Sequence, residues 1–357
     1  MENFKIKAIG LMSGTSLDGL DVCHATFTKT CGRWDFTIDD ARGYDYDDEM
    51  KYKLGTGAQR MSAYEFCAFH SEYGKFLGER VADFMREYGL RPDIVASHGH
   101  TIFHEPHQRI MCQIGDGAAI AAEARVPVVS DFRRLDIMLG GEGAPLVPIG
   151  DRLLFGDYDY CLNIGGFSNI SFEHEGQRLA FDISPANYVL NRYCRQHGLE
   201  FDRDGLIARS GTIDATLLNQ LDSLPFYAQT GAKSLGREWV EQEVYPLIDA
   251  RGLEFANVLA TFTEHAARQI ANVVKRYPKV GSRMLITGGG ALNVYMVERI
   301  RELAGCTVEI PSRQIIEFKE ALIFAFLGAL YMADEVSCLS SVTGAACDNI
   351  GGMLFKI

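Results

Sequence analysis

Hydrophobic and polar positions along the chain follow patterns that predict strands alternating with helices. The expected strands are residues 4–12, 21–27, 34–38, 94–97, 110–114, 128–130, 158–163, 171–172, 179–182 and 284–287. Apolar side chains recur at helical spacing in residues 62–88, 117–124, 185–196, 213–221, 238–244, 255–276 and 317–333. Strands that alternate with helices in this way predict the α/β class.

The first two expected strands are joined by a glycine-containing turn with no helix between them, so they form a hairpin. The turn contains two glycines, Gly14 and Gly19, which permit positive φ and close backbone approach. Its main-chain N–H groups and the hydroxyls of Thr15 and Ser16 can face a phosphate, while Asp18 can face a metal ion or water. A P-loop would need a helix and a lysine after the glycines. The plain alternative is a tight turn with side-chain caps.

A similar strand, glycine turn and strand occur again in the second half of the chain. Here Gly165 and Gly166 separate the two strands. Two halves that each present a glycine hairpin to a shared cleft could clamp the phosphates of a nucleotide. A third cluster, Gly288, Gly289 and Gly290, follows the strand 284–287 and leaves room for adenine and ribose, unless it is a plain turn.

Composition favours a globular protein of two domains. The chain has 357 residues, 47% of them hydrophobic and 23% charged. Its formal charge of −12 argues against a nucleic-acid or anionic-membrane surface. The nine cysteines form no C-x-x-C pair, a pattern that suits buried thiols in a reducing compartment. Without an apolar leader or a run long enough to span a bilayer, the protein is expected in the cytoplasm.

Polar residues cluster where several expected strands end. His98 and His100 follow the strand 94–97, and His100 and His104 are expected to be solvated loop histidines. The segment 131–145, rich in glycine and charge, is expected to cross between the two lobes. Asp182 ends the strand 179–182, just before a helix that begins near Pro185.

With these motifs in place, the chain closely resembles the anhydro-N-acetylmuramic acid kinases, a branch of the superfamily of sugar kinases, heat-shock ATPases and actin. The resemblance covers essentially the whole chain in order. It lies in the segments 12–19, 97–99, 113–116, 131–133, 140–148, 163–166, 181–182, 233–238, 288–290 and 343–345.

The resemblance implies two ribonuclease-H-like lobes with mixed sheets flanked by helices, hinged over a cleft. The expected lobes are residues 1–135 plus 335–357, and residues 136–334. ATP with Mg²⁺ is the implied donor, and a homodimer is implied. In the implied reaction, water adds to the anomeric carbon of 1,6-anhydro-N-acetylmuramic acid and the freed O6 takes the γ-phosphoryl group. The product, N-acetylmuramic acid 6-phosphate, belongs to cell-wall recycling.

Site residues are carried over from the family motifs. Asp182 matches the catalytic aspartate and is expected to act as the general base, the alternative being an N-cap of the next helix. The implied phosphate segment consists of Gly14, Thr15, Ser16, Leu17, Asp18, Gly19, Leu20 and Asp21, and Asp18 is assigned to the metal. Gly165, Gly166, Gly288, Gly289 and Gly290 are also expected to contact the nucleotide.

The lactyl carboxylate of the sugar needs a fixed cation. Arg133 is the first choice, because a guanidinium can bind a carboxylate through two parallel hydrogen bonds, and His98 is the second. An exposed surface arginine is the plain alternative. Asn187 is also assigned to the substrate site.

The chain departs from the usual family pattern in three places. Where many members read Phe-Asp-Thr-Gly-Pro-Gly-Asn, this chain has Ile183, Ser184 and Ala186 around Pro185. His100 stands where glutamine is usual, and Ala232 where proline is usual. The aspartate is retained, so these changes affect substrate fit more than reaction type and leave open a kinase for a different sugar. A catalytically silent nucleotide-binding relative is a separate alternative.

Overall fold

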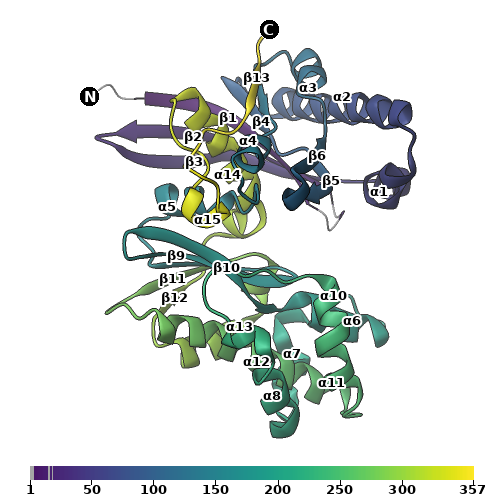
Figure 1. The fold of residues 1–357 in the computed structure, drawn as a ribbon, viewed down its shortest axis with the longest axis vertical. Helices are drawn as coiled ribbons and strands as arrows, with labels where there is room; N and C mark the ends of the chain where they lie inside the picture. Colours follow the sequence, from purple (N-terminus) through teal and green to yellow (C-terminus); the bar gives the residue numbers. More distant parts are fainter. Residues whose placement is uncertain (1–3, 15–16, 18) are drawn as a thin grey trace. The chain divides into compact units, whose positions relative to one another are not determined.

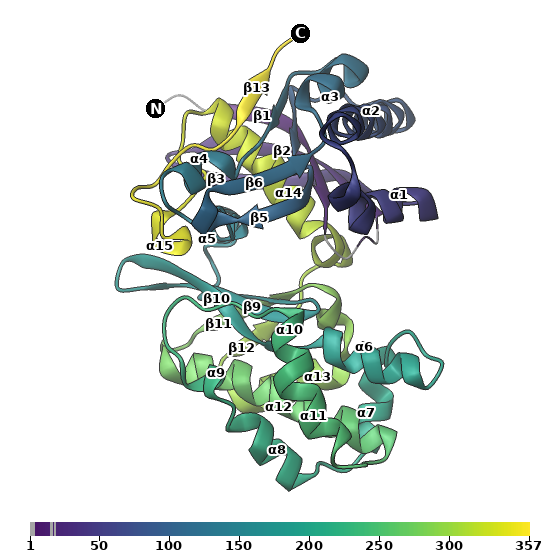
Figure 2. The same cartoon turned by 45° about the vertical axis from the view of Figure 1, so that its right-hand side comes forward.

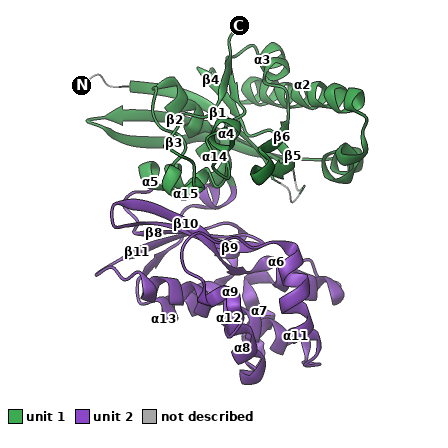
Figure 3. Cartoon of the chain, in the orientation of Figure 1, with its two compact units in different colours: residues 1–154, 318–357 green, residues 155–317 purple. Residues whose placement is uncertain are grey.

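The chain folds into two compact units in the computed structural model, which describes residues 4–14, 17 and 19–357. Residues 1–154 and 318–357 form the first unit, and residues 155–317 form the second (Figure 3). These boundaries differ from the expected lobes, because residues 136–154 and 318–334 belong to the first unit. Gly150 lies directly against Ile323, and Lys319 forms a buried ion pair of 2.7 Å with Asp151. The segment 131–145 therefore lies within one unit and does not cross between units.

The first unit is built on a six-stranded mixed sheet with the order β13-β7-β4-β1-β2-β3 (Figure 1). Neighbouring strands β1 to β3 are antiparallel, β4 runs parallel to β1, and β7 runs parallel to β4. The strands are β1 (Phe4–Ser13), β2 (Gly19–Thr30), β3 (Arg33–Asp45), β4 (Ile94–Ser97), β7 (Val128–Ser130) and β13 (Met353–Phe355).

Helices pack on this sheet according to the alternation of its side chains. On one face, Ile9 and Leu11 of β1 share a core with α2 (Ala63–Tyr88), which in turn packs on α3 (Gly117–Ala124). On the other face, Gly10 lies against the backbone of α14 (Arg313–Met332), so closely that a Cβ would be 1.9 Å from Ala321 O. The sheet is therefore covered by helices on both faces.

The remaining elements of the first unit are short. They are α1 (Asp48–Tyr52), η1 (Lys53–Gly57), η2 (Ala58–Arg60), the two-stranded sheet of β5 (His100–Glu105) and β6 (Ile110–Ile114), η3 (Pro106–Gln108), α4 (Arg134–Met138), α5 (Val147–Leu154) and α15 (Ser340–Thr343).

The second unit repeats the strand order of the first. Its five-stranded sheet has the order β10-β9-β8-β11-β12, with β8 to β10 antiparallel and with β11 parallel to both β8 and β12. The first unit has the same arrangement in β3-β2-β1-β4-β7. The strands are β8 (Tyr160–Ile164), β9 (Phe167–His174), β10 (Gln177–Pro185), β11 (Arg283–Thr287) and β12 (Thr307–Glu309). The expected repeat of a strand, glycine turn and strand is confirmed.

A helical layer packs on this second sheet (Figure 2). The long helix α12 (Phe255–Arg276) contacts α6 (Asn187–Gln196), α7 (Leu206–Ser210), α8 (Ala215–Asp222) and α13 (Val294–Ala304). The other helical segments are η4 (Arg203–Gly205), α9 (Pro225–Ala228), α10 (Arg237–Trp239), η5 (Val240–Val244), α11 (Tyr245–Asp249) and η6 (Gly289–Leu292).

The predicted α/β class with two units of mixed sheets is confirmed, and some elements match to the residue. Helix α12 and strand β4 have the predicted bounds, and α2 begins after Ser62, which forms a capping box with Glu65. The helix expected at 238–244 is instead a turn of α10 followed by a π-helical segment. Among the described residues, no helix combines the length and apolar character that a membrane crossing requires.

Candidate active site

Asp182 lies on β10 at a β-bulge. Asp182 pairs with Asn169 and Ser184 pairs with Ser168, so Ile183 is the extra residue of the strand. Asp182 Oδ2 accepts a hydrogen bond of 2.8 Å from Leu235 N, and Asp182 N donates to Lys233 O at 3.0 Å. Among the described residues, Oδ1 accepts no hydrogen bond. Bulges are common beside active sites because they re-aim a side chain.

The environment of Asp182 suits a general base. Burial raises the pKa of its carboxyl group, and the hydrogen bond from Leu235 N opposes that rise. A carboxylate whose pKa is raised accepts a proton more readily near neutral pH. The N-cap alternative is wrong, because Ala186 occupies the N-cap of α6 and no side chain caps that helix.

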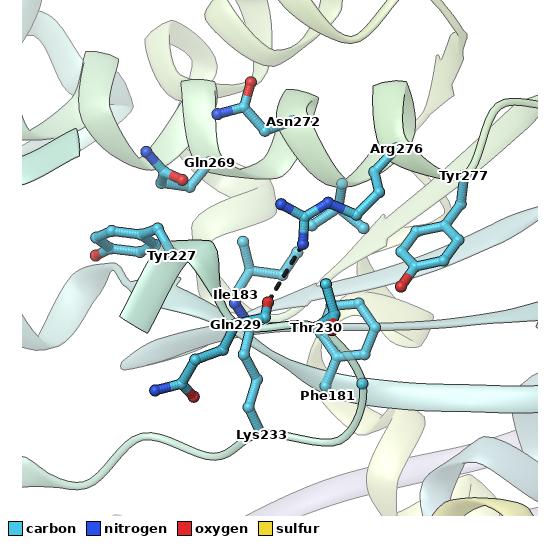
Figure 4. A pocket seen from close by; sticks show the side chains of 12 residues that line it. Phe181, Ile183, Tyr227, Gln229, Thr230, Lys233, Gln269, Asn272, Arg276 and Tyr277 are labelled. Carbon is cyan, nitrogen blue, oxygen red and sulfur yellow. Dashed lines mark hydrogen bonds between the residues drawn. The ribbon is translucent and has the colours of Figure 1, made fainter. Parts of the chain in front are cut away.

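Two cationic side chains donate hydrogen bonds to the backbone of the segment that leads to Leu235, the residue that contacts Asp182. Lys233 Nζ donates to Phe226 O at 3.1 Å, and Arg276 Nη1 donates to Gln229 O at 3.2 Å. Figure 4 shows Arg276 reaching Gln229 across a small pocket that Tyr227 and Gln269 also line. This pocket has a volume of about 20 Å³, which is room for about one water. The loop therefore presents Leu235 N to the carboxylate from a supported backbone.

Two glycine turns meet at the carboxyl end of the second sheet. Because β8 and β11 are parallel neighbours, Gly165 and Gly166 after β8 lie at the same edge as Gly288 to Gly290 after β11. The carbonyl oxygens of Gly165 and Gly166 accept hydrogen bonds from the first N–H groups of α6, including Asn187 N at 3.2 Å. The Gly165–Gly166 turn is thus hydrogen-bonded to the start of α6, directly after the strand that carries Asp182.

The glycines of these turns fall into two classes. Gly288 has φ +79° and a Cβ there would be 2.6 Å from Asn163 Oδ1, while a Cβ on Gly290 would be 2.2 Å from Ile164 Cγ2. Packing against Asn163 and Ile164 therefore requires glycine at positions 288 and 290. In contrast, a Cβ on Gly165, Gly166 or Gly289 would meet no atom closer than 3.6 Å. Neither packing nor a positive φ requires glycine at these three positions, which fits close approach of a ligand to the backbone.

A pocket of about 850 Å³ lies beside Gly289 in the second unit. Asn187 and Asn293 line it, together with residues that the sequence analysis did not identify: Phe201, Arg203, Asp204, Arg301 and Arg313. Its volume falls in the range of small-molecule and cofactor sites. These lining residues come from four separate segments, so no local pattern could have found them. Three of the lining hydrophobic side chains, Phe201, Leu292 and Val294, are exposed in the structure.

The first unit holds Arg133 as a fixed cation. Arg133 is half-buried and donates from Nη1 to Gly143 O at 2.7 Å and from Nη2 to His98 Nε2 at 2.9 Å. Its Nε is buried without a hydrogen-bond partner among the described residues. Burial lowers its pKa to about 10, with Glu320 the main opposing influence, so the guanidinium remains charged near neutral pH. The plain alternative of a solvated surface arginine does not hold.

His98 is neutral and accepts a hydrogen bond from Arg133. Its Nδ1–H donates to Gly99 O at 2.9 Å, and its Nε2 accepts from Arg133 and from Gln113 Nε2. Burial and then the charge of Arg133 hold the pKa of His98 well below its usual range. His98 therefore does not supply a second cation, although contact with a substrate stays a prediction. It also lines a pocket of about 470 Å³ with Asp116 and Asp131.

The expectation for His100 was wrong. His100 lies in β5, is 2% exposed, and its Nδ1 lies 2.9 Å from Ser13 Oγ. Tyr46 Oη donates to the same hydroxyl at 2.8 Å and is linked to Tyr73 Oη. Burial lowers the pKa of His100 to about 4. His104 is exposed as expected, although it too lies in β5.

The expected phosphate hairpin joins β1 to β2. Thr15, Ser16 and Asp18, including the proposed metal contact of Asp18, lie outside the described residues. Leu17 has φ +62° and donates from its N–H to Gly14 O at 3.1 Å. Gly19 is needed for packing, because a Cβ would be 2.4 Å from Tyr44 O. Leu20 is buried in the core, so only its backbone could face a ligand, and Asp21 is half-buried.

The predicted site residues divide between the units. The hairpin, His98 and Arg133 belong to the first unit, and Asp182, Asn187 and the later glycine turns belong to the second. In the part of the chain that the structure describes, no group of three or more His, Cys, Asp or Glu is placed to hold a metal ion.

Comparison with known proteins identifies the family. The model of the family described as "Anhydro-N-acetylmuramic acid kinase" matches residues 6–356. Proteins of that name include one from Xanthomonas oryzae pv. oryzae, 34% identical over 97% of this chain and 96% of its own length. Another, from Rhodopseudomonas palustris, is 34% identical over 98% of this chain and 99% of its own length.

Likenesses to solved structures are weaker. Component A of (R)-2-hydroxyglutaryl-CoA dehydratase from Acidaminococcus fermentans matches with 11% identity and a TM-score of 0.47, over 92% of this chain and 100% of that one. Such a likeness is too low to bear on function. From the match of the family model and the identity to these relatives, the chain belongs to the anhydro-N-acetylmuramic acid kinase family.

Proposed function

We propose that this protein is an ATP-dependent kinase that opens 1,6-anhydro-N-acetylmuramic acid with water and phosphorylates O6. The product is N-acetylmuramic acid 6-phosphate, an intermediate in peptidoglycan recycling. The observation that carries this proposal is Asp182, a carboxylate with a raised pKa that lies on a bulged strand beside two glycine turns, in a member of this family.

Asp182 acts as the general base. Its Oδ2 is oriented by Leu235 N, and Oδ1 takes the proton of a water as the water oxygen bonds to the anomeric carbon. The bond between that carbon and O6 breaks, and the electron pair stays on O6. O6 then bonds to the γ-phosphorus, and ADP leaves. Water, sugar and ATP are thus converted to the sugar phosphate and ADP, with one proton released through Asp182.

The nucleotide occupies the second unit. The pocket of about 850 Å³ beside Gly289 receives adenine and ribose, and the open backbone of Gly165, Gly166 and Gly289 faces the phosphates. Bound ATP supplies the phosphoryl group that O6 receives. Mg²⁺ needs only one or two carboxylates besides the phosphates, and we assign Asp18 to it.

Arg133 binds the lactyl carboxylate of the sugar. Its Nη1 and Nη2 are fixed by Gly143 O and His98 Nε2, and each carries a second hydrogen that it can donate to a carboxylate. A guanidinium held in this way loses little freedom on binding a carboxylate. Asn187, in the first turn of α6, is assigned to the substrate side of the site. We further propose a cytoplasmic homodimer, as the family resemblance implies.

The reaction is tested by turnover in water enriched in ¹⁸O. The purified protein, ATP, Mg²⁺ and the anhydro sugar are mixed, and the product is analysed promptly by mass spectrometry and ³¹P NMR. We expect one ¹⁸O on the anomeric carbon and an unlabelled phosphate on O6. Phosphorylation of other amino sugars alone would favour a kinase for a different sugar. Nucleotide binding without turnover of any sugar would favour a silent relative.

A further inference from the structure

Residues 229–236, the clamp segment, connect α9 to α10 and meet the edge of the second sheet at Asp182. Strand β10 is the last strand in the order of that sheet, so β9 is its only neighbour among the described strands. Asp182 N donates to Lys233 O at 3.0 Å, and Leu235 N donates to Asp182 Oδ2 at 2.8 Å. The main chain and the carboxylate of Asp182 are therefore both held by the clamp segment.

The clamp segment buries little of its own surface. Lys233 and Leu235 are half-buried, and the other six residues of the segment are exposed. Gly231 has φ +84°, and a Cβ there would meet no atom within 4 Å. A segment with few buried contacts opens at a low cost in free energy unless other interactions fix it. The position of the clamp segment therefore depends on its hydrogen bonds.

Phe226, a buried residue of α9, anchors the clamp segment. Lys233 Nζ donates to Phe226 O at 3.1 Å and lies 4.3 Å from the centre of the Phe226 ring. Trp239, in the helix that follows the clamp segment, packs on the same ring with a centroid distance of 5.3 Å. The segment thus leaves α9, is bonded to it through Lys233, and packs against it again at Trp239.

Lys233 links this anchor to the proposed base. Its side chain bonds to Phe226, and its carbonyl oxygen accepts from Asp182 N. Arg276 also bonds to the segment, but at Gln229 O, on the other side of the small pocket (Figure 4). Hydrogen bonds from a charged donor are about twice as strong as those between neutral groups, and an aromatic face attracts the same cation.

We propose that Lys233 is a positioning residue that fixes the clamp segment on α9 and thereby aims the carboxylate of Asp182. This inference rests on the proposed function of Asp182 as the base, because it explains how that base is held. Small displacements of a reacting group reduce the rate strongly, by about 100-fold for an error of about 1 Å.

The test compares Lys233→Met with a matched control, Lys279→Met. Methionine keeps an unbranched stem but supplies neither a charge nor a donor. Lys279 is also a half-buried lysine of the second unit, 5.7 Å from the centre of the Tyr160 ring and 3.6 Å from Asp159 Oδ1. Steady-state kinetics with ATP and the anhydro sugar should show kcat reduced about 10- to 100-fold in Lys233→Met, with an unchanged KM for ATP. Lys279→Met should keep the wild-type kcat.

The pH dependence of kcat separates positioning from general damage. The hydrogen bond from Leu235 N lowers the pKa of Asp182, because it stabilises the ionised carboxylate. Its loss in Lys233→Met should raise that pKa and move the acid limb of kcat to higher pH, while Lys279→Met leaves the limb in place. Lys233→Arg keeps a charged donor that can stack on Phe226, so it should restore most of the wild-type kcat and the position of the limb.

Amide hydrogen exchange tests the clamp segment without any turnover. The N–H groups of Asp182 and Leu235 both bond across the contact between β10 and the segment. In wild type both should be protected, because release of the segment exposes both. Both should exchange about 10- to 100-fold faster in Lys233→Met, as expected for the loss of one hydrogen bond from a charged donor, and at the wild-type rate in Lys279→Met.

The outcomes distinguish this inference from the proposed function. If wild type turns over the sugar, and Lys233→Met matches Lys279→Met in kcat and exchange, the positioning role is refuted while the kinase stands. If wild type does not turn over the sugar, the proposed function fails, and the exchange comparison alone decides whether Lys233 fixes the segment. Should Lys233→Met fail to fold, exchange of the Asp182 and Leu235 amides in wild type at the rate of an open loop would still refute the inference.

Discussion

Replacing Asp136 by asparagine tests how the first unit holds the segment that carries Arg133. Asp136 is fully buried. Its Oδ1 accepts from Cys338 Sγ, Thr343 Oγ1 and Asn349 Nδ2 at 3.0, 2.8 and 3.0 Å, and its Oδ2 accepts from Gly143 N at 2.8 Å. One carboxylate thus joins the 140–145 segment to the C-terminal segment.

The expected loss of stability is large. In Asp136→Asn the amide NH₂ faces Gly143 N–H, so a buried donor loses its acceptor, and the three remaining bonds go to a neutral oxygen. A lost bond to a charged acceptor costs about 1.5–3 kcal/mol, and neutral bonds are roughly half as strong as charged ones. Allowing for partial relaxation, we expect about 4 kcal/mol of destabilisation, a large share of a typical total of about 5–15 kcal/mol.

The two tryptophans allow this loss to be assigned to one unit. Trp34 lies in the first unit and Trp239 in the second. In a Trp239→Phe background, Trp34 fluorescence during urea unfolding should show a midpoint lower by roughly 2 M, for an m-value of about 2 kcal/mol/M. In a Trp34→Phe background, the transition reported by Trp239 should move much less.

A matched control uses the buried Asp202 of the second unit. Its oxygens accept from Ile207 N and Ala208 N, each at 2.9 Å. Asp202→Asn should move the Trp239 transition and leave the Trp34 transition in place. The reasoning fails if Asp136→Asn shifts the Trp34 midpoint no more than a surface substitution does.

Three further predictions follow from the site. Because burial raises the pKa of Asp182, kcat should fall as the pH drops through a value above the usual carboxyl range near 4, and a pH–rate profile with an acid limb at or below about 4 would contradict this. Gly289→Ala should weaken ATP binding in calorimetry without lowering the melting temperature, whereas Gly288→Ala, at φ +79°, should lower the melting temperature. His100→Gln should preserve stability, because the glutamine amide can still accept a hydrogen bond from Ser13 Oγ. His100→Leu should lower the free energy of unfolding in urea by about 1–3 kcal/mol, and equal stability of the two variants would refute a stabilising role for the bond to Ser13.

Sequence periodicity predicted the elements with long or fully apolar patterns. Helix α12 was correct because its helical spacing continues over 22 residues, and strand β4 was correct because its apolar run of 4 residues is too short for a helix. Helices α4 and α5 were missed, because α4 has only five residues and α5 contains Pro148 and Gly150, which have low helix propensity. The lobe boundary was misplaced because the contact of Gly150 with Ile323 joins residues far apart in sequence.

Only part of the candidate site could be predicted from the sequence. The glycine turns were found from the residue pattern and the role of Asp182 through the family motifs, but the division of the glycines into packed and open positions needed coordinates. The pocket beside Gly289 is lined by residues of four separate segments, which no local pattern reveals. His98 was expected to be a cation, and only its three hydrogen bonds show that it is neutral.

The most direct test of the account is the turnover of Asp182→Asn. The asparagine can still accept from Leu235 N but cannot take a proton from water. With ATP and the anhydro sugar, followed by ³¹P NMR, we expect sugar phosphate to form about 10²- to 10⁴-fold more slowly than in wild type, with ATP binding unchanged in the same preparation. Formation of the sugar phosphate at the wild-type rate would contradict the assignment of Asp182 as the base.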